Sequence, residues 1–489
     1  MKPEHGLAYH PSTGGQPMSP VITAPARDIP VLGGYDVVVC GGGPAGCAAA
    51  TAAARQGLRA LLVEGQGQLG GMGTSGLVSH WLGGRSYDCK SWVVGGIFRE
   101  LTLRAVRQGI ALMPDVEPEG KFSPHGWCRH GAITAGIPFD PFAMAALLDD
   151  VMAEAGVEVR LCTEVVDTVV KDGAITHAIL HNKSGLQAVA AKAFIDATGD
   201  ADVAARSGCD TVLGREEDRR MTPVTLQVQM DHIDAEAHAA YANAHGQGGS
   251  FRFLDEIQQL IKTGEWPFEY NRLISVQLSA PDTFMVNTSR LVGFDGTDGA
   301  SVSKAMAQGR RESWQLLAIL RKHVPGFKNA RIKAVATLLG VRETRRIIGA
   351  FVLRVQDFVD DVPFPDVIGQ SAYGWDLPTP ERPSDNPDVG RERGVKRTIL
   401  PIPYRIMLPR PMTNLICPGR SVSVERDVLG PLRVMAPCMA MGEAAGTAAA
   451  QVVQKGSSFS AVCIPTLRAE LQRHGAILDG VQAVTLPSR

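Results

Sequence analysis

Residues 35–76 read YDVVVCGGGPAGCAAATAAARQGLRALLVEGQGQLGGMGTSG, and this stretch decides the fold. Its apolar start, residues 35–40, has the length and β-branched content of a buried parallel strand. Gly41, Gly43 and Gly46 follow with the spacing G-x-G-x-x-G. In this pattern the first glycine permits a tight turn, the second lets backbone approach a pyrophosphate, and the third lets a helix pack closely on the strand. The stretch therefore predicts a strand, a phosphate-binding turn and a helix.

An alanine-rich helix is expected over residues 44–56, with a glycine just past its end. Pro44 and Ala45 open this helix, and proline in the first turn is a helix-start signal. The N-terminal amides of the helix would face a pair of phosphates. A second strand, residues 58–63, ends at Glu64, where a carboxylate can accept hydrogen bonds from both hydroxyls of an adenosine ribose. The order strand, glycines, helix, strand and acid predicts a dinucleotide site, and this unit alone does not separate FAD from NAD.

Two further segments favour FAD over NAD. A glycine-rich loop, residues 68–76, follows the acid. Such a loop can run alongside the ribityl chain and the diphosphate of a flavin dinucleotide. A strand expected over residues 191–197 ends in the sequence TGD, at the carboxyl edge where open α/β sheets bind ligands. The cofactor contacts predicted in these segments are Gly70, Gly71, Thr74, Thr198, Gly199 and Asp200.

These motifs resemble the flavoprotein superfamily of the glutathione reductase and fumarate reductase type, and more narrowly the group called FAD-dependent oxidoreductases. The resemblance recurs at residues 138–159, 194–208, 340–349, 402–409 and 414–450. It implies an α/β fold in which a discontinuous Rossmann-like FAD-binding domain, with a parallel sheet and an antiparallel meander crossover, carries an inserted antiparallel α+β substrate domain.

The resemblance also implies cofactor contacts outside the first segment. It places the backbone of Val165 against the adenine and a turn at Gly419 and Arg420 beneath the flavin. A small-residue helix over residues 434–454, with Pro437 in its first turn, would aim backbone amides at the flavin N1 and O2 edge. A reduced flavin is anionic there, and a helix N-terminus stabilises that charge.

The predicted domains follow from these motifs. They are an N-terminal arm (1–34), a first part of the FAD-binding domain (35–208) with a lid-like segment (77–136), a substrate or cap domain (209–400), and a second part of the FAD-binding domain with the C-terminal helix (401–489). Within the first part, three alternating runs between residues 163 and 190 predict an antiparallel meander, separate from the strand over residues 191–197.

Composition narrows the function classes. Lys plus Arg number 49 and Asp plus Glu 50, so there is no basic excess of the kind that nucleic acid attracts. No segment reaches the 18 apolar residues of a membrane span, and the first 34 residues lack the apolar centre of a signal peptide, which makes a cytoplasmic location the expectation. The nine cysteines form no C-x-x-C or C-x-x-x-x-C pair, so we expect no redox-active disulfide, iron–sulfur cluster or metal site.

Four side chains are candidates for chemistry beside a flavin. Arg342 offers a guanidinium suited to a substrate carboxylate or a developing negative charge, unless it only ties a loop to acidic neighbours. Tyr404 and Arg433 flank the last strand and helix, where either could hold a substrate or pass a proton, or be structural. His80 could act as a general base near N5. The fumarate reductase resemblance also raises covalent flavin attachment at His80, but LVSHWLGG does not match that branch's attachment pattern.

One segment is set aside at this point. Residues 372–388 lack the histidine that many relatives carry after a comparable tyrosine and aspartate, so no catalytic base is predicted there.

The leading functional prediction is an FAD-dependent dehydrogenase or reductase that moves a hydride between a small organic substrate and flavin N5. Two alternatives stay open. One is a non-redox flavoprotein, a hydratase or isomerase, and the other is the flavin subunit of an electron-transfer complex, which the lack of a cysteine cluster disfavours. The predicted partners are a small-molecule substrate and an electron acceptor or donor that the sequence does not identify, with self-association left open.

Overall fold

The computed structural model describes residues 22–23, 25–86, 88–113, 136–245 and 253–484. Most of the expected N-terminal arm, residues 1–21, lies outside the described residues, as does part of the expected lid-like segment, residues 114–135. The end of the arm already belongs to a strand, because β1 begins at Val31. Across the described chain, no helix combines the length and the apolar character needed to cross a membrane.

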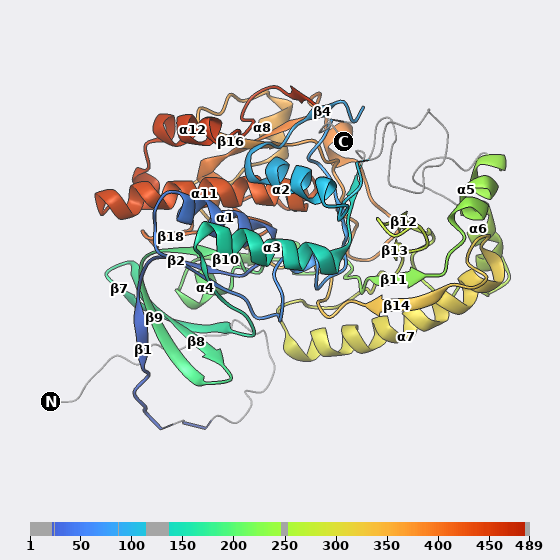
Figure 1. Ribbon diagram of the computed structural model, residues 1–489, viewed down its shortest axis with the longest axis horizontal. Helices are drawn as coiled ribbons and strands as arrows, with labels where there is room; N and C mark the ends of the chain where they lie inside the picture. The colour runs from blue at the N-terminus through green and yellow to red at the C-terminus, as the bar shows by residue number, and fades with distance from the viewer. Residues whose placement is uncertain (1–21, 24, 87, 114–135, 246–252, 485–489) are drawn as a thin grey trace.

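A mixed sheet, here called the main sheet, organises one half of the molecule (Figure 1). Its strands run in the order β6-β2-β1-β9-β8-β7, and β18 pairs with β9. The pairs β6–β2, β2–β1, β1–β9 and β9–β18 are parallel, whereas β7, β8 and β9 form an antiparallel meander. The strands are β1 (Val31–Cys40), β2 (Ala60–Val63), β6 (Glu158–Arg160), β7 (Glu164–Lys171), β8 (Ala174–Asn182), β9 (Gly185–Asp196) and β18 (Leu415–Ile416).

One strand corrects the expected strand boundaries. The third run of the meander and the strand expected over residues 191–197 are a single twelve-residue strand, β9. Its first half pairs with β8 and its second half with β1. No glycine, proline or other turn residue interrupts the sequence between Leu186 and Asp196, so the chain stays extended as it passes from one partner to the other. The meander and the nucleotide-binding sheet therefore share a rigid element.

Two small-residue helices lie against each other beside the main sheet, α1 (Pro44–Arg55) and α11 (Met435–Lys455), and Figure 1 shows them side by side. A Cβ added to Gly442 would lie 2.0 Å from the carbonyl oxygen of Ala45, and one added to Gly446 would lie 2.1 Å from that of Ala49. Such contacts allow only glycine, so the two helices meet backbone to backbone. This packing brings the N-terminus of α11 close to that of α1.

A second, antiparallel sheet, here called the cap sheet, lies in the other half of the molecule (Figure 1). Its strand order is β12-β13-β11-β14, and helix α7 packs on it to form a separate apolar cluster. The elements are β11 (Val228–Asp231), β12 (Ser275–Gln277), β13 (Phe284–Val286), β14 (Arg331–Val335), α5 (Ala235–Ala244), α6 (Leu254–Lys262) and α7 (Gly299–His323). The main sheet, with its parallel strands and antiparallel meander, and the antiparallel cap sheet together confirm the predicted fold class.

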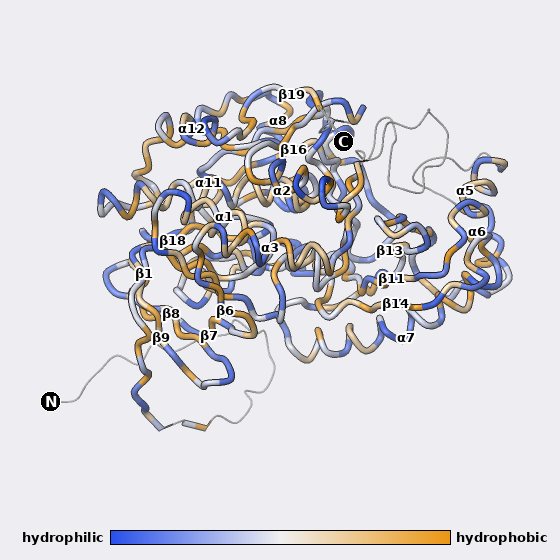
Figure 2. Tube along the Cα trace, in the orientation of Figure 1, coloured by the Kyte–Doolittle hydropathy of each residue, from blue (hydrophilic) through white to orange (hydrophobic). Residues whose placement is uncertain are grey.

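Further strands pair outside the two sheets. β10 pairs with β15, β16 with β17, β3 with β5 and β4 with β19. Figure 2 shows hydrophobic residues gathered in the strands of the main sheet and the helices beside it, with hydrophilic residues in the outer turns. The strands are β3 (His80–Trp81), β4 (Ser91–Trp92), β5 (Ile137–Pro138), β10 (Thr211–Leu213), β15 (Arg345–Ile347), β16 (Val367–Ser371), β17 (Leu400–Pro403) and β19 (Gln482–Ala483). The helices are α2 (Gly96–Arg107), α3 (Pro141–Ala155), α4 (Asp202–Arg206), α8 (Val355–Val359), α9 (Val389–Glu392), α10 (Leu429–Leu432) and α12 (Ile464–Arg473).

Candidate functional site

The glycine turn after β1 is shaped by the backbone that surrounds it. A Cβ on Gly41 would lie 2.5 Å from the carbonyl oxygen of Ala197, and one on Gly46 would lie 1.8 Å from that of Gly41. A Cβ on Gly43 would meet no protein atom within 4 Å. Gly41 and Gly46 are therefore needed for packing, whereas Gly43 leaves its backbone open to something outside the chain. A pyrophosphate at the start of α1, beside Pro44 and Ala45, fits this opening.

The glycine-rich loop lies across this turn. The Gly70 amide donates to the Gly42 carbonyl at 2.8 Å, and a Cβ on Gly71 would lie 2.9 Å from the Cα of Gly43. The Thr74 hydroxyl donates to the Leu69 carbonyl at 2.5 Å, so it holds the loop closed. The loop thus forms one wall of the opening beside Gly43, as the cofactor prediction requires.

The acid at the end of β2 keeps acceptor capacity for a ribose. The carboxylate of Glu64 accepts hydrogen bonds from the backbone amides of Gly42, at 2.6 Å, and Gln66, at 2.7 Å. Burial raises the pKa of Glu64, although these amides act in the opposite direction. A carboxylate has about four acceptor positions, which leaves about two for ribose hydroxyls. The geometry fits the predicted role.

Arg420 joins three distant segments at the carboxyl edge of the main sheet. Its guanidinium donates to the carbonyl of Gly199 at 2.7 Å, to the carbonyl of Val341 at 2.6 Å and to the carboxylate of Asp200 at 2.6 Å. The Thr198 hydroxyl donates to the carboxylate of Asp196 at 2.6 Å. The side chains of Asp200 and Thr198 therefore fix the TGD loop, and contact of this loop with a cofactor stays a prediction.

The remaining predicted cofactor contacts occupy positions compatible with their predicted roles. Gly419 has a φ of +107°, and a Cβ added to it would lie 3.5 Å from the Cβ of Ala45. The turn after β18 therefore lies against the start of α1. Pro437 lies in the first turn of α11, where the first amides of a helix have no intrahelical acceptor. Val165 is half-buried in β7, opposite Leu180. Contact of these residues with a flavin or adenine stays a prediction.

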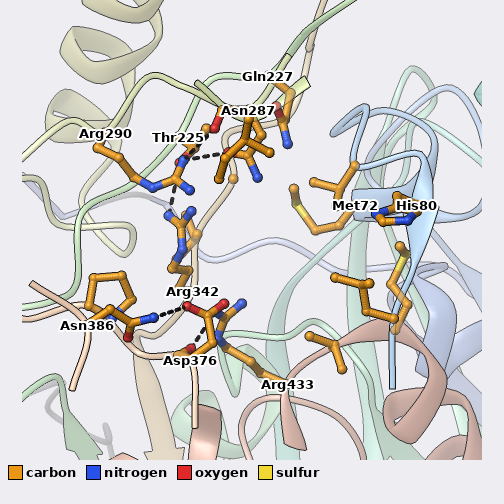
Figure 3. Close-up of a pocket in the computed structure, with 18 of the residues that line it drawn as sticks. Met72, His80, Thr225, Gln227, Asn287, Arg290, Arg342, Asp376, Asn386 and Arg433 are labelled. Atoms are coloured by element: carbon orange, nitrogen blue, oxygen red, sulfur yellow. Dashed lines mark hydrogen bonds and ion pairs between the residues drawn. The ribbon is translucent and has the colours of Figure 1, made fainter. Parts of the chain in front are cut away.

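A cavity of about 220 Å³ lies between the two sheets, and Figure 3 shows its lining. One wall comes from the segments just described, the other from the cap sheet and the segment before α9. The first wall contains Met72, Arg420, Val434 and Met435, and Gly340 and Val341 lie where the two walls meet, because Gly340 pairs with Thr225. The second contains Thr225, Gln227, Tyr270, Asn287, Arg290 and Asp376, among others. Because the loop after the glycine turn and the start of α11 reach this cavity, its first wall is where a flavin ring would lie.

Three of the four predicted chemical side chains line this cavity: His80, Arg342 and Arg433. His80 is buried in β3, and a Cβ on Gly136 would lie 1.5 Å from its Nε2 atom, so glycine at position 136 makes room for the imidazole ring. Arg342 donates to the carbonyl of Pro223 at 2.6 Å and to the hydroxyl of Thr225 at 3.0 Å. Figure 3 shows His80 and Arg342 on opposite sides of the cavity. Their chemical roles stay predictions.

Tyr404 lies elsewhere. It is 2% exposed within the core of the main sheet, and its hydroxyl donates to the carbonyl of Phe459 at 3.0 Å. It is absent from the described lining of the cavity. The structure therefore does not bring Tyr404 together with the other three candidates. The phenol closes a hydrogen bond within the core instead.

A polar cluster that the sequence reasoning set aside lines the cavity. The Tyr373 hydroxyl donates to Asp376 at 2.6 Å, the amide of Asn386 donates to the same carboxylate at 2.7 Å, and Arg433 lies 3.2 Å from it. Burial acts to raise the pKa of Asp376, but the charge of Arg433 and the bond from Tyr373 lower it overall. Burial and the Asp376 charge raise the pKa of Tyr373 well above its ordinary value. The pair is therefore an ionised carboxylate beside a neutral phenol.

Sequence reasoning also missed the polar residues of the cap. Thr225 and Gln227 alternate with Leu226, which packs into an apolar cluster while its neighbours face the cavity. That alternation is visible in the sequence, but an alternating polar face usually contacts water. This polar face lines an enclosed site only because the main sheet lies opposite it, and the sequence does not show that position.

Comparisons with known proteins identify the family. The family model described as FAD dependent oxidoreductase matches residues 36–471. A comparison with curated proteins found no match.

Solved structures similar to this chain include a geranylgeranyl bacteriochlorophyll reductase-like protein from Thermoplasma acidophilum, with 14% identity over 90% of this chain and 82% of that one at a TM-score of 0.45. A flavin-dependent brominase has 14% identity over 90% and 84% of the two chains at a TM-score of 0.46. The p-nitrophenol 4-monooxygenase of Pseudomonas putida DLL-E4 has 14% identity over 90% and 89% at a TM-score of 0.44.

The family match runs from β1 into α12 and includes every segment that frames the open glycine turn and the cavity. The predictions of an enzyme and of FAD as its cofactor are confirmed. The chain belongs to the FAD dependent oxidoreductase family.

Proposed function

We propose that this enzyme moves a hydride between a small organic molecule and N5 of FAD, with that molecule bound in the cavity between the two sheets. The proposal rests on one observation: two different sets of residues form the two walls of this cavity. Its first wall belongs to segments that frame the cofactor site, and its second wall carries buried polar side chains. FAD, when bound, would supply the electron acceptor or donor. The cap and the segment before α9 would hold the reacting molecule.

Tyr373 and Asp376 are the pair that we propose moves a proton to or from a substrate oxygen. The phenol is neutral and already donates to the ionised carboxylate at 2.6 Å. As the phenol oxygen takes a proton from the substrate, the phenol proton can pass to the carboxylate, and the reverse transfer returns it. Arg433 and Asn386 hold the carboxylate in place.

The proposal is tested by mixing the FAD-loaded protein, without oxygen, with small acids, alcohols and amines and following the flavin absorbance. Saturable bleaching by one of these compounds, or reoxidation of pre-reduced protein by its oxidised form, supports hydride transfer. Turnover without any bleaching would indicate a hydratase or isomerase. Reduction by a protein donor alone would indicate an electron-transfer subunit.

Tyr373→Phe tests the proton-moving pair. Loss of a general acid or base slows catalysis by about 10²–10⁴, so we expect flavin reduction to slow by at least about 100-fold, with substrate affinity little changed, in stopped-flow measurements. Tyr404→Phe is the matched control, because it removes a phenol hydroxyl that lies in the core. It should leave the rate near that of the parent enzyme. Equal rate losses in the two variants would contradict the assignment.

A further inference from the structure

Two buried arginines in the cavity lack an acidic partner. Arg290 and Arg342 are each 9% exposed, and within the described residues no carboxylate oxygen lies within the 4.0 Å that defines an ion pair for either of them. Two further arginines of the cavity differ, since Arg420 pairs with Asp200 at 2.6 Å and Arg433 with Asp376 at 3.2 Å. Positive charge therefore exceeds negative charge in the buried lining of this cavity.

The partners that these two arginines do have are neutral: oxygens for both and, for Arg290, the ring of Tyr270, whose centroid lies 4.5 Å from the guanidinium carbon. Nη1 of Arg290 donates to the side-chain oxygens of Asn287, at 2.5 Å, and Thr225, at 3.0 Å. Nη1 of Arg342 shares the same Thr225 hydroxyl at 3.0 Å. The Nε of Arg290 is buried and has no hydrogen-bond partner in the described structure. Figure 3 shows the two guanidinium groups converging on Thr225. Two like charges held this close, with donors to spare, form a fork for an anion.

Energetics favour an anionic ligand over an empty fork. A buried charge without a partner costs several kcal/mol in proteins, and two adjacent cations repel each other as well. Burial lowers the pKa of Arg342 well below its ordinary value, and the charges of Arg290 and Arg433 lower it further. A carboxylate relieves both penalties, because its two oxygens match the planar fork of a guanidinium.

A second polar group of the cavity is also unsatisfied. Gln227 is 1% exposed, and neither its amide oxygen nor its amide nitrogen has a hydrogen-bond partner in the described structure. Gln227 and Thr225 both line the cavity, two residues apart on an extended segment, so their Cα atoms are separated by about 7 Å. A ligand anchored near Thr225 can thus present a second polar group to Gln227.

We infer that the substrate is a small organic acid whose carboxylate is bound between Arg290 and Arg342, with a second polar group facing Gln227. This inference rests on the proposed function for the cavity and adds the chemical class of its substrate. A carboxylate at this fork lies in the cap wall, opposite the wall where the flavin ring would lie. The rest of the acid then extends across the cavity.

The test is equilibrium binding to the FAD-loaded enzyme, which needs no turnover. The probes are succinate, 4-hydroxybutanoate, benzoate and 4-hydroxybenzoate, each compared with its primary amide. Binding is read from the change in the oxidised flavin spectrum and from the thermal unfolding midpoint. We expect at least one acid to bind at least 10-fold more tightly than its amide, and a hydroxylated acid to bind more tightly than its parent acid.

Variants assign the effect to the fork. Arg290→Gln and Arg342→Gln should each weaken acid binding at least 10-fold while leaving amide binding unchanged, and Arg290→Lys and Arg342→Lys should keep part of the acid preference. Arg311→Gln removes the same charge from the exposed face of α7 and should change nothing. FAD content and unfolding midpoint show whether each variant is folded, and if a glutamine variant is not, the lysine variant carries the comparison.

Three outcomes separate this inference from the proposed function. Acids that bind no better than their amides, or glutamine variants that bind acids normally, overturn the inference. An enzyme that is reduced by a neutral compound without any acid preference overturns the inference and leaves hydride transfer standing. Tight, fork-dependent acid binding with no redox change in any probe supports the inference and counts against hydride transfer.

Discussion

Single residues show which predictions a sequence can support. Gly43 and Gly46 belong to one motif, yet the structure separates their roles, because an added Cβ meets no protein atom within 4 Å at Gly43 and lies 1.8 Å from a backbone oxygen at Gly46. Gly46 is needed for packing, whereas Gly43 leaves its backbone open to a ligand. Both roles were expected from the spacing, since that spacing reflects one recurrent backbone path.

Gly43→Ala should therefore separate cofactor binding from stability. The backbone of Gly43 is extended, with φ of −72° and ψ of −174°, so alanine fits without strain. We expect the unfolding midpoint of the FAD-free protein to stay unchanged while FAD affinity falls at least 10-fold, as measured by fluorescence titration. Gly46→Ala is the contrast and should lower the midpoint even without FAD. Normal FAD affinity in Gly43→Ala would show that the phosphates lie elsewhere.

Side chains were harder to place than glycines. Arg342 was assigned to a substrate site because its neighbours in sequence resemble a family motif, and it does line the cavity. Tyr404 was assigned by a similar argument, but its chain position near the last strand says nothing about which way the ring points, and the ring enters the core. Tyr373 and Asp376 were set aside for want of a histidine, although they face the cavity together.

Elements were predicted well where local chemistry marks both ends. The helix expected over residues 44–56 is α1, Pro44–Arg55, with a proline in its first turn and Gly57, at a φ of +82°, just past its end. β9 was divided in error, since pairing with two different neighbours leaves no local signal. The cap sheet was recognised as antiparallel, but its position opposite the cofactor segments depends on tertiary contacts.

One contact between elements carries a pH-dependent charge. Glu443, within α11, accepts a hydrogen bond from the Ile97 amide at the start of α2 at 2.9 Å. Burial raises the pKa of Glu443 to about 8. A Cβ on Gly96 would lie 2.1 Å from its carboxylate, so the contact excludes water. The carboxyl group is therefore protonated in the folded protein at neutral pH, unlike in the unfolded chain.

Stability should fall as pH rises through this window. Between the unfolded pKa, about 4.5, and the folded pKa, about 8, the folded state binds more protons than the unfolded state, so the free energy of unfolding decreases with pH. Glu443→Gln keeps the acceptor and removes the titration. We expect the free energy of unfolding of the variant, minus that of the parent, to be a few kcal/mol larger at pH 8.5 than at pH 5, because each pKa unit corresponds to about 1.36 kcal/mol. Denaturant unfolding at the two pH values measures this difference. A constant difference across this range would contradict the buried acid.

At the scale of the whole molecule, many separate segments frame the opening predicted for FAD. The opening for FAD is framed by β1, the loop after β2, the TGD loop, the turn after β18 and the start of α11. A ligand that binds only the folded state stabilises it by RT ln(1 + [L]/Kd). Removal of FAD should therefore lower the unfolding midpoint of the entire protein in a single transition.

Differential scanning calorimetry with and without added FAD measures this effect. At FAD concentrations of about 100 times Kd, the expected gain is about 2.7 kcal/mol. AMP serves as a control, because it reaches only the adenine side and should stabilise less. If added FAD left the unfolding midpoint unchanged and the protein stayed colourless, the predicted FAD site would be wrong.

The junction of β18 with β9 has a consequence for biosynthesis. Leu415 and Ile416 complete the sheet more than 200 residues after the strand with which they pair, and the guanidinium of Arg420 then ties the TGD loop to the segment around Val341. A nascent polypeptide still lacking these residues has neither the final strand nor the turn that follows it. Capture of the vitamin-derived cofactor should therefore wait until residues 415–420 have left the ribosome, and a product that stops before them should retain the cofactor poorly.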